Sequence, residues 1–449
     1  MKIGIIFPRY KYPTGDVPLG ICYLSSYLQK TNNVKPQIID TTFHESIKET
    51  KKILETKFDI LCFSIMTTMI KDSLELADYI KEKHPNTKIV FGGPHTTVMP
   101  EEMLKNKSVD AVVIGEGEKI FSDLIKNNLD FKKTKGIWYK DKIIIKNEKN
   151  EFIHNLDDIP FPDIEQLNMK EYFKNWFQLE SVKFGLKGLN IIASRGCPYD
   201  CTFCQPTLSR IFGKKIRKRS AKNIKQELKH WKDKYNIKAF MFQDDTLIAD
   251  KKWTSEICRE IKELNLLWGC NVRANLVEEE TLRKMKAAGL RKVFMGVESG
   301  SQRVLNEVYD KKITLKQVEN AVNIVNKLGI RIQGYFMIGA PSETLEEIKQ
   351  TIKFSNKLRL DEATFSITTP LPHTYLYDMI KDKITKDVSD FDYYKNSVFN
   401  HKLGAKKLDK LRKEALLKFY LNPRRIHNTI GSFLTPQSFV RNLKKLKRF

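Results

Sequence analysis

The most informative stretch of this sequence is Ser194-Arg195-Gly196-Cys197-Pro198-Tyr199-Asp200-Cys201-Thr202-Phe203-Cys204. Three of the seven cysteines lie here within eight residues, in the spacing C-x3-C-x2-C. Thiolates this close in sequence can bind one inorganic centre, and a cubane iron–sulfur cluster normally takes four of them. Because no fourth cysteine lies nearby, the simplest interpretation is a four-iron [4Fe-4S] cluster on Cys197, Cys201 and Cys204. One iron then stays open for a substrate or cosubstrate.

Two other interpretations of these cysteines are weaker. A structural zinc site needs four protein ligands, and the one nearby candidate, His230, is poorly spaced. Three unrelated buried thiols would not account for the regular spacing or for the aromatic residue before the last cysteine. The remaining cysteines lie in apolar patterns, and we expect them to be core residues. They are Cys22, Cys62, Cys258 and Cys270.

The cysteine stretch resembles the signature loop of radical S-adenosylmethionine (SAM) enzymes. The resemblance implies that SAM binds the open iron through its amino and carboxylate groups. An electron from a donor such as flavodoxin, ferredoxin or a reductase then cleaves SAM, and the 5′-deoxyadenosyl radical takes a hydrogen atom from the substrate. The cofactors carry this chemistry, so we name no catalytic acid or base residue.

Length and composition set the class of protein. The chain has 449 residues, enough for two or three domains, with 30% charged and 41% hydrophobic residues. No apolar run reaches the roughly 20 residues that span a bilayer, and the first residues do not resemble a secretory signal. Since the cluster needs reduced thiols, we expect a cytosolic protein. The net charge of +25 is spread widely and does not by itself indicate a nucleic-acid partner.

Residues 1–130 alternate short apolar runs with helical patterns, which predicts an α/β fold with a doubly wound parallel sheet. The expected strands are Lys2–Phe7, Lys35–Ile39, Asp59–Ile65, Lys88–Phe91 and Ala111–Ile114. The expected helices are Leu19–Lys30, His44–Glu55, Lys71–Lys83, Glu101–Lys105 and Glu118–Asn127. Ligands of such sheets bind beyond the carboxyl ends of the strands, where this sequence is rich in glycine.

These glycine-rich loops resemble the cobalamin-binding domain of B12-dependent radical SAM enzymes. The likeness lies in the stretches Asp16–Gly20, Gly92–His95 and Ile114–Glu118. It implies cobalamin contacts by Thr67, Gly92, Gly93, Pro94, His95, Gly115, Glu116 and Gly117. Many cobalamin proteins carry D-x-H-x-x-G after the first strand, but this loop begins Pro8-Arg9-Tyr10-Lys11 and has no histidine. We therefore expect no cobalt ligand from that loop, and His95 is more simply a hydrogen-bonding turn residue.

Residues 131–189 are predicted to be a linker with a hairpin about Lys140-Asp141-Lys142, and residues 190–375 a second domain. Six β-α units in that domain predict a partial, open (β/α)6 barrel with the cysteine stretch after its first strand. The expected strands are Leu189–Ala193, Ala239–Gln243, Trp268–Val272, Lys292–Val297, Arg331–Ile338 and Glu362–Ile367. The resemblance implies SAM contacts by Tyr199, Phe203, Gln243, Arg273, Glu298, Ser299, Ile338 and Gly339. Arg273 could instead form a structural ion pair.

Residues 376–449 are predicted to be a helical extension that caps the barrel or contacts the substrate. The segment 402–449 has 14 Lys or Arg against two acids, and Pro436–Phe449 places apolar residues on one helical face. The simplest interpretation is a packed helix with a solvated basic face. Peripheral membrane contact, which would suit a lipid substrate, and nucleic-acid binding are the alternatives.

Together these resemblances imply a cobalamin-dependent radical SAM enzyme acting on a small-molecule or lipid substrate. Methyl transfer from methylcobalamin to an unactivated carbon is the preferred reaction, and cyclisation or rearrangement without methyl transfer, as in the tetrapyrrole cyclase branch, is the alternative. A tRNA methylthiotransferase is a minor alternative. That family carries a second set of three cysteines near its N-terminus, whereas here only Cys22 and Cys62 lie there, far apart.

Overall fold

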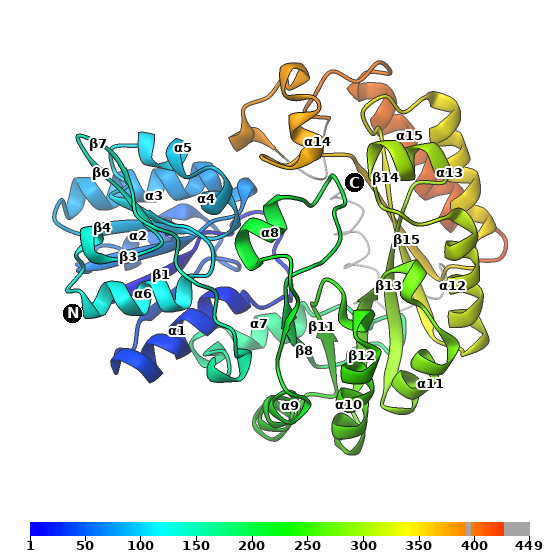
Figure 1. The fold of residues 1–449 in the computed structure, drawn as a ribbon, viewed down its shortest axis with the longest axis horizontal. Helices are drawn as coiled ribbons and strands as arrows, with labels where there is room; N and C mark the ends of the chain where they lie inside the picture. The colour runs from blue at the N-terminus through cyan, green and yellow to red at the C-terminus, as the bar shows by residue number, and fades with distance from the viewer. Residues whose placement is uncertain (392–396, 426–449) are drawn as a thin grey trace. The chain divides into compact units, whose positions relative to one another are not determined.

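The computed structural model describes residues 1–391 and 397–425 (Figure 1). The chain forms two compact units. The first contains Met1–Pro198 and Pro206–Gln243, and the second contains Tyr199–Gln205 and the chain from Asp244 onward. The predicted domain boundaries follow sequence motifs rather than contacts, and they stay predictions.

The first unit begins with a seven-stranded sheet in the order β2-β1-β3-β4-β5-β6-β7. Its first five strands are parallel, as predicted, and β1, β3 and β4 are almost entirely apolar and buried. Such strands are typical of a sheet covered by helices on both faces. The seven strands are β1 (Ile3–Phe7), β2 (Gln37–Asp40), β3 (Ile60–Ser64), β4 (Lys88–Gly92), β5 (Ala111–Val113), β6 (Ile137–Asp141) and β7 (Ile143–Lys146).

Helices cover both faces of this sheet. α1 and α6 pack against each other on one face, whereas α3, α4 and α5 lie on the other (Figure 1). The order 2-1-3-4-5 places a topological switch point between β1 and β3, where ligands of doubly wound sheets bind. The helices are α1 (Leu19–Asn32), α2 (Ile47–Ile53), α3 (Ile70–Lys83), α4 (Pro94–Val98), α5 (Pro100–Lys105) and α6 (Gly117–Lys126).

The predicted hairpin is present, and it belongs to the sheet. β6 pairs antiparallel with β5, and β7 pairs antiparallel with β6. Ile137 and Tyr139 of β6 are buried in the same core as Ile120 and Phe121 of α6. The alternating pattern that predicted the hairpin thus also supplies the apolar face that joins it to the sheet.

All six strands of the predicted barrel form, and the α/β class is confirmed. In the first unit β8 (Gly188–Ile191) pairs in parallel with β11 (Ala239–Phe242). In the second unit four strands pair in parallel, namely β12 (Leu267–Val272), β13 (Leu290–Glu298), β14 (Arg331–Ile338) and β15 (Glu362–Ile367). The accompanying helices are α9 (Ala221–Tyr235), α10 (Lys251–Ile261), α11 (Glu279–Ala287), α12 (Leu315–Lys327) and α13 (Leu345–Lys357).

One helix of the second unit differs in kind from the prediction. The sequence pattern predicts an α-helix over Ser301–Val308, but the structure has a π-helical turn over Val304–Val308. The amide of Tyr309 donates to the carbonyl of Val304 at 2.9 Å, which is the i to i+5 pattern. Single π-turns of this kind are frequent at functional sites, and hydrophobic periodicity cannot distinguish them from α-helix.

The C-terminal extension is helical, as predicted. α14 (Tyr375–Asp378) is short, and α15 (Ala405–Tyr420) packs against β15 and α13. The hydroxyl of Tyr420 donates to the carbonyl of Ala363 in β15 at 2.9 Å. No helix among the described residues is long and apolar enough to cross a membrane. The predicted helix Pro436–Phe449 lies outside the described residues, as does the membrane contact inferred from it.

Candidate cobalamin and cluster sites

The loop after β4 is held tightly by its neighbours. Gly93 has a φ of +92°, and a Cβ on it would lie 2.7 Å from the amide nitrogen of Ile65, so the position requires glycine. Pro94 starts α4, where its missing N–H costs no hydrogen bond. The amide of His95 donates to the carbonyl of Ile65 at 3.1 Å. The Gly92–His95 stretch is therefore a fixed turn at the carboxyl end of the sheet.

His95 points into the protein and not toward solvent. Its side chain is 1% exposed, and its Nδ1 lies 3.2 Å from the hydroxyl of Thr67, another predicted cobalamin contact. Burial lowers the pKa of His95 to about 4, so the imidazole is neutral at physiological pH. Its Nε2 has no hydrogen-bond partner in the described part of the chain.

The loop after β5 is joined to α4 by a hydrogen bond from the amide of Gly115 to the hydroxyl of Thr97, at 3.1 Å. Gly115 has a φ of +90°. At Gly117 a Cβ would meet nothing within 4 Å, so protein packing does not demand a glycine there. The open space at Gly117 is available to a ligand that approaches the start of α6.

Glu116 was predicted as a cobalamin contact, and the structure gives its carboxylate two arginine partners. Arg195 lies 3.0 Å from it and Arg217 lies 2.6 Å from it. Burial opposes the charge of Arg195, but Glu118 and Glu116 outweigh it, so the pKa of this guanidinium lies above its ordinary value. The sequence prediction missed both arginines, because no short-range pattern pairs residues that lie far apart in the chain.

The residues of these loops suit a corrinoid. They combine an unpartnered buried nitrogen on His95, open space at Gly117 and a rigid turn at Gly93, all at the carboxyl end of one parallel sheet. Side-chain hydroxyls and backbone amides there can bind a large ligand with many amide groups. The cobalamin contacts of individual residues stay predictions.

The cysteine stretch begins in a short ladder that the sequence did not reveal. β9 (Ser194–Arg195) pairs antiparallel with β10 (Arg217–Lys218). Gly196 follows with a φ of +99°, and a Cβ there would lie 2.6 Å from the carbonyl oxygen of Lys215. The chain can therefore turn from β9 into Cys197 only with glycine at this position.

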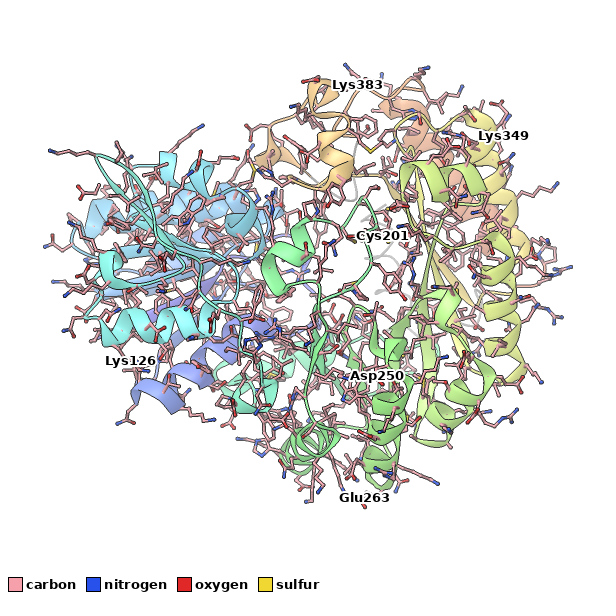
Figure 2. All side chains as sticks on the ribbon, viewed as in Figure 1. Lys126, Cys201, Asp250, Glu263, Lys349 and Lys383 are labelled. Carbon is pink, nitrogen blue, oxygen red and sulfur yellow. The ribbon has the colours of Figure 1, made fainter. Side chains whose placement is uncertain are left out.

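Residues 199–205 are held by backbone hydrogen bonds, whereas the thiols differ in exposure. Thr202 donates twice, from its amide to Tyr309 at 3.0 Å and from its hydroxyl to Val308 at 2.6 Å. Cys201 is buried, Cys197 is half-buried and Cys204 is exposed (Cys201 is labelled in Figure 2). Within the described residues, no three His, Cys, Asp or Glu side chains are close enough to hold a metal ion together. The three thiols supply the donors that a [4Fe-4S] cluster with one open iron needs, and their role as its ligands stays a prediction.

Arg273, a predicted SAM contact, lies against the cysteine loop. Its Nη1 is 3.4 Å from the Sγ of Cys201, and its guanidinium lies 3.9 Å from the ring centre of Tyr199. Its Nε has no hydrogen-bond partner within the described residues. Arg273 can therefore donate to a cluster sulfur on one side and keep a donor for an anionic ligand on the other. Cys201 and Tyr199 are thus the neighbours of its guanidinium, and both the SAM contact and the structural ion pair stay predictions.

Glu298 ends β13 in a backbone conformation that is rare for a side chain. Its φ is +66°, at a register shift between β13 and β14. Its carboxylate pairs with the Nζ of Lys311 at 2.5 Å, and both side chains are at most 10% exposed. Lys311 also lies 5.7 Å from the ring centre of Phe203 in the cysteine loop. No local pattern in the sequence indicates Lys311 as the partner of Glu298, because its position depends on the π-turn before it.

Ser299 differs from Glu298 next to it. It is fully buried, and its hydroxyl lies 3.2 Å from that of Thr351 and accepts from the amide of Ser301 at 3.1 Å. These bonds start the next helical turn. The SAM contact of Ser299 stays a prediction. The same holds for Gln243, whose backbone amide donates to the carbonyl of Ile191 at 2.9 Å.

The Ile338-Gly339 segment is arranged around a buried carboxylate. Oε2 of Glu343 accepts from the amides of Gly339 and Ala340 at 2.6 and 2.9 Å. Its Oε1 has no hydrogen-bond partner in the described chain. Burial raises the pKa of Glu343 to about 7. The side chain of Ile338 is itself fully buried, so this segment can offer a ligand its backbone but not that side chain.

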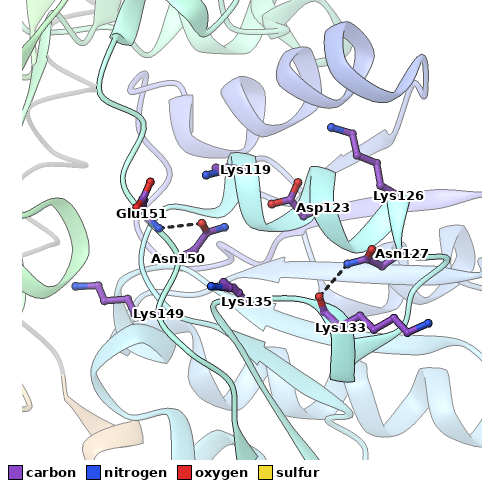
Figure 3. Close-up of a pocket in the computed structure, with 9 residues that line it drawn as sticks. All are labelled: Lys119, Asp123, Lys126, Asn127, Lys133, Lys135, Lys149, Asn150 and Glu151. Atoms are coloured by element: carbon purple, nitrogen blue, oxygen red, sulfur yellow. Dashed lines mark hydrogen bonds between the residues drawn. The ribbon is translucent and has the colours of Figure 1, made fainter.

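One cavity of the first unit does not coincide with these loops. A cavity of about 510 Å³ lies beside α6 and is lined mainly by lysines (Figure 3). The lining residues are Lys119, Asp123, Lys126, Asn127, Lys133, Lys135, Lys149, Asn150 and Glu151. It includes none of the predicted cofactor contacts, so we assign it no role in the chemistry.

Sequence comparisons place both parts of the chain in known families. The B12 binding domain matches residues 15–125, and the Radical SAM superfamily matches residues 191–355. A methyltransferase from Pyrococcus horikoshii, itself uncharacterized, is 34% identical over 444 residues, which cover 94% of this chain and 93% of that protein. The anaerobic magnesium-protoporphyrin IX monomethyl ester cyclase of Rubrivivax gelatinosus is 27% identical over 88% of this chain and 72% of its own length.

Two further matches widen this set. A protein of Methanocaldococcus jannaschii that is named as a methylthiotransferase is 30% identical over 74% of this chain and 73% of its own length. Among solved structures, the radical SAM methyltransferase TsrM from Kitasatospora setae, with cobalamin and a [4Fe-4S] cluster bound, aligns with a TM-score of 0.70. It is 17% identical and covers 85% of this chain and 75% of its own, so it shows the fold alone.

The chain therefore belongs to the radical SAM enzymes that carry a B12-binding domain. Its cofactors are those of this class, namely cobalamin, SAM and a [4Fe-4S] cluster. Proteins of both the methyltransferase and the cyclase kind are similar to it.

Proposed function

We propose that this enzyme transfers a methyl group to an unactivated carbon of a small-molecule substrate. The observation that carries the proposal is the similarity to a methyltransferase along almost the full length of both chains. Methylcobalamin would supply the methyl group, and SAM on the cluster would supply the radical that prepares the carbon. An electron donor of the flavodoxin or ferredoxin type would reduce the cluster.

The residues of this chain would have distinct tasks. Cys197, Cys201 and Cys204 would hold the cluster, and Arg273 would donate to the sulfur of Cys201 while orienting Tyr199. Glu298, held by Lys311, would present an oxygen to SAM beside the cysteine loop. The Gly339-Ala340 turn, fixed by Glu343, would offer backbone groups to the adenine. These assignments rest on the family resemblance and on the observed contacts.

A cyclase reaction is the second candidate, because a cyclase is 27% identical over 88% of the chain. The methylthiotransferase alternative has a named relative, but its second cysteine set is not seen in the sequence. Cys22 and Cys62 are both buried in the sheet domain. A lipid substrate at a membrane surface rests on the C-terminal tail and stays a prediction.

Anaerobic reconstitution with SAM carrying a trideuterated methyl group distinguishes the first two reactions. Methyl transfer yields S-adenosylhomocysteine together with 5′-deoxyadenosine, with the deuterium label in the cobalamin fraction by mass spectrometry. Formation of 5′-deoxyadenosine without S-adenosylhomocysteine and without label in cobalamin would contradict methyl transfer and favour cyclisation. Label in a thioether product would favour the methylthiotransferase.

A further inference from the structure

Four charged side chains of the first unit are buried against one another, and we call them the arginine–glutamate cluster. They are Glu116, Glu118, Arg195 and Arg217. Arg195 donates to Glu116 at 3.0 Å and to Glu118 at 2.6 Å. Arg217 donates to both oxygens of Glu116, at 2.6 and 2.9 Å. All four side chains are at most 10% exposed, and two positive charges face two negative ones.

The members of this cluster come from two segments that each adjoin a predicted cofactor site. Glu116 and Glu118 belong to the loop that follows β5 and starts α6. Arg195 and Arg217 lie opposite each other in the ladder of β9 and β10. Because Gly196 alone separates Arg195 from Cys197, the ladder sets the position of the Cys197 backbone.

Further contacts hold the ladder in one position. Arg217 also donates to the carbonyls of Ile153 and Phe212, at 2.6 and 3.0 Å, and lies 4.8 Å from the ring centre of Phe152. Arg195 lies 5.8 Å from the ring centre of Tyr23. Both guanidiniums are thus fixed by groups on several sides, which limits the number of positions the ladder can take.

The carboxylates of the arginine–glutamate cluster already accept hydrogen bonds from its two arginines. Oε1 of Glu116 accepts two hydrogen bonds and Oε2 accepts a third, and Oε1 of Glu118 accepts from Arg195. A cobalamin contact by Glu116 would have to compete with charge-assisted, buried hydrogen bonds to both of its oxygens. The open space beside it lies at Gly117, which has no side chain.

We infer that Glu116 and Glu118 are positioning residues that fix the Cys197 ladder to the cobalamin loop, and that neither carboxylate contacts cobalamin. The backbone of the same loop remains available to the corrinoid. The cobalamin loop and the start of the cysteine loop then move as one piece, which keeps Cys197 at a constant distance from the cobalamin loop. This inference concerns the class of enzyme and holds for methyl transfer and for cyclisation alike.

The test uses the full chain, reconstituted anaerobically, with the variants Glu116→Gln, Arg217→Gln and the charge-balanced double variant. Glu101→Gln is the matched control, because Glu101 forms an exposed ion pair with Lys146. Three quantities are measured at equal iron content. They are the dissociation constant for hydroxocobalamin, the electron paramagnetic resonance (EPR) spectrum of the reduced iron–sulfur cluster with and without SAM, and the rate of 5′-deoxyadenosine formation.

For Glu116→Gln we expect hydroxocobalamin affinity within about twofold of wild type, an altered SAM-bound EPR spectrum and at least a tenfold loss of 5′-deoxyadenosine formation. The double variant should recover part of the wild-type spectrum, because it removes one charge of each sign. A loss of stability alone would lower the melting temperature without changing the spectrum of the folded fraction. If Glu116→Gln does not fold, Glu118→Gln and the double variant carry the test.

Three outcomes would overturn the inference. One is a tenfold loss of hydroxocobalamin affinity in Glu116→Gln with an unchanged EPR spectrum of the iron–sulfur cluster. That result would make Glu116 a cobalamin contact. Another is an unchanged spectrum in every variant. The third is a double variant no closer to wild type than either single variant. A failure of the methyl-transfer proposal would leave these results untouched, since none of the three readouts depends on whether the substrate is methylated.

Discussion

The loop after β5 and the cysteine loop are both predicted to contact a cofactor, yet they are built in opposite ways. In the loop after β5, the amide of Gly115 donates a hydrogen bond to the hydroxyl of Thr97. The carboxylates of Glu116 and Glu118 are buried against arginines. In the cysteine loop the backbone is anchored through Thr202, but Cys204 is exposed. No three metal-ligating side chains converge among the described residues.

The difference shows what each ligand requires of the protein. A corrinoid is a large molecule that needs a preformed surface. Contacts within the chain can build that surface before the corrinoid binds. An iron–sulfur cluster is small and binds thiolates strongly, so its own bonds can supply the energy that orders the ligands. Five predictions probe this contrast, and they run from the largest expected effect to the smallest.

The cluster ligands should show the largest effect. We expect Cys201→Ala to lose the cluster and all 5′-deoxyadenosine formation, because only three protein thiolates hold the iron. Iron content and SAM products by mass spectrometry measure this, and Cys197→Ala and Cys204→Ala should behave alike. Cys270→Ala is the control, since Cys270 is fully buried in β12. An equal loss of iron in that control would contradict the three-cysteine site.

Glu298→Gln should reduce 5′-deoxyadenosine formation about 100-fold, a loss of roughly 3 kcal/mol in the transition state. The change leaves the Lys311 ammonium buried without its carboxylate, and the amide cannot balance a charge. Glu307→Gln is the control, because Glu307 forms a largely exposed ion pair with Arg303. Equal single-turnover rates for the two variants would show that this ion pair does not position SAM.

Glu343 should give the second unit a pH-dependent stability. The pKa of its carboxyl rises from 4.5 to about 7 on folding, so the folded protein holds this proton more tightly than the unfolded chain. The free energy of unfolding should therefore fall as pH rises from about 4.5 to about 7, by up to about 3 kcal/mol. Urea unfolding of wild type and Glu343→Gln at pH 5 and pH 8 measures the difference. Parallel pH profiles for the two proteins would refute the raised pKa.

Arg273→Lys should make the cluster harder to reduce. Arg273 donates to the sulfur of Cys201, and hydrogen bonds to cluster sulfurs raise the reduction potential. We expect a shift of about −60 mV, equivalent to tenfold in a one-electron equilibrium. A redox titration followed by EPR measures it. The control is Arg283→Lys on the exposed face of α11, and a potential equal to wild type in Arg273→Lys would remove the proposed bond.

His95→Ala should have the smallest effect on the metal. We interpret His95 as a hydrogen-bonding residue whose Nδ1 faces Thr67 and whose Nε2 is available to an amide group of the corrinoid. We therefore expect cobalt to keep the same lower ligand in the variant. The EPR spectrum of cob(II)alamin bound to each protein decides this. Nitrogen superhyperfine splitting that is present in wild type and absent in the variant would identify His95 as the ligand.

The sequence by itself determined the fold class and the chemistry of the cluster. Regular spacing carries that information locally, because C-x3-C-x2-C fixes the donor set and alternating apolar runs fix strands such as Ile3–Phe7 and Arg331–Ile338. The four remaining cysteines were predicted to lie in the core, and all four are buried.

Tertiary structure alone decided which charges meet. Arg217 reaches Glu116 across 101 positions of sequence, and Lys311 reaches Glu298 after a π-turn that no hydrophobic period reveals. Likewise the ladder of β9 and β10 has two residues per strand, too few to leave a pattern. A buried charge is stable only beside its opposite, so these partners are chosen by the folded chain as a whole, and the sequence near either residue does not specify the other.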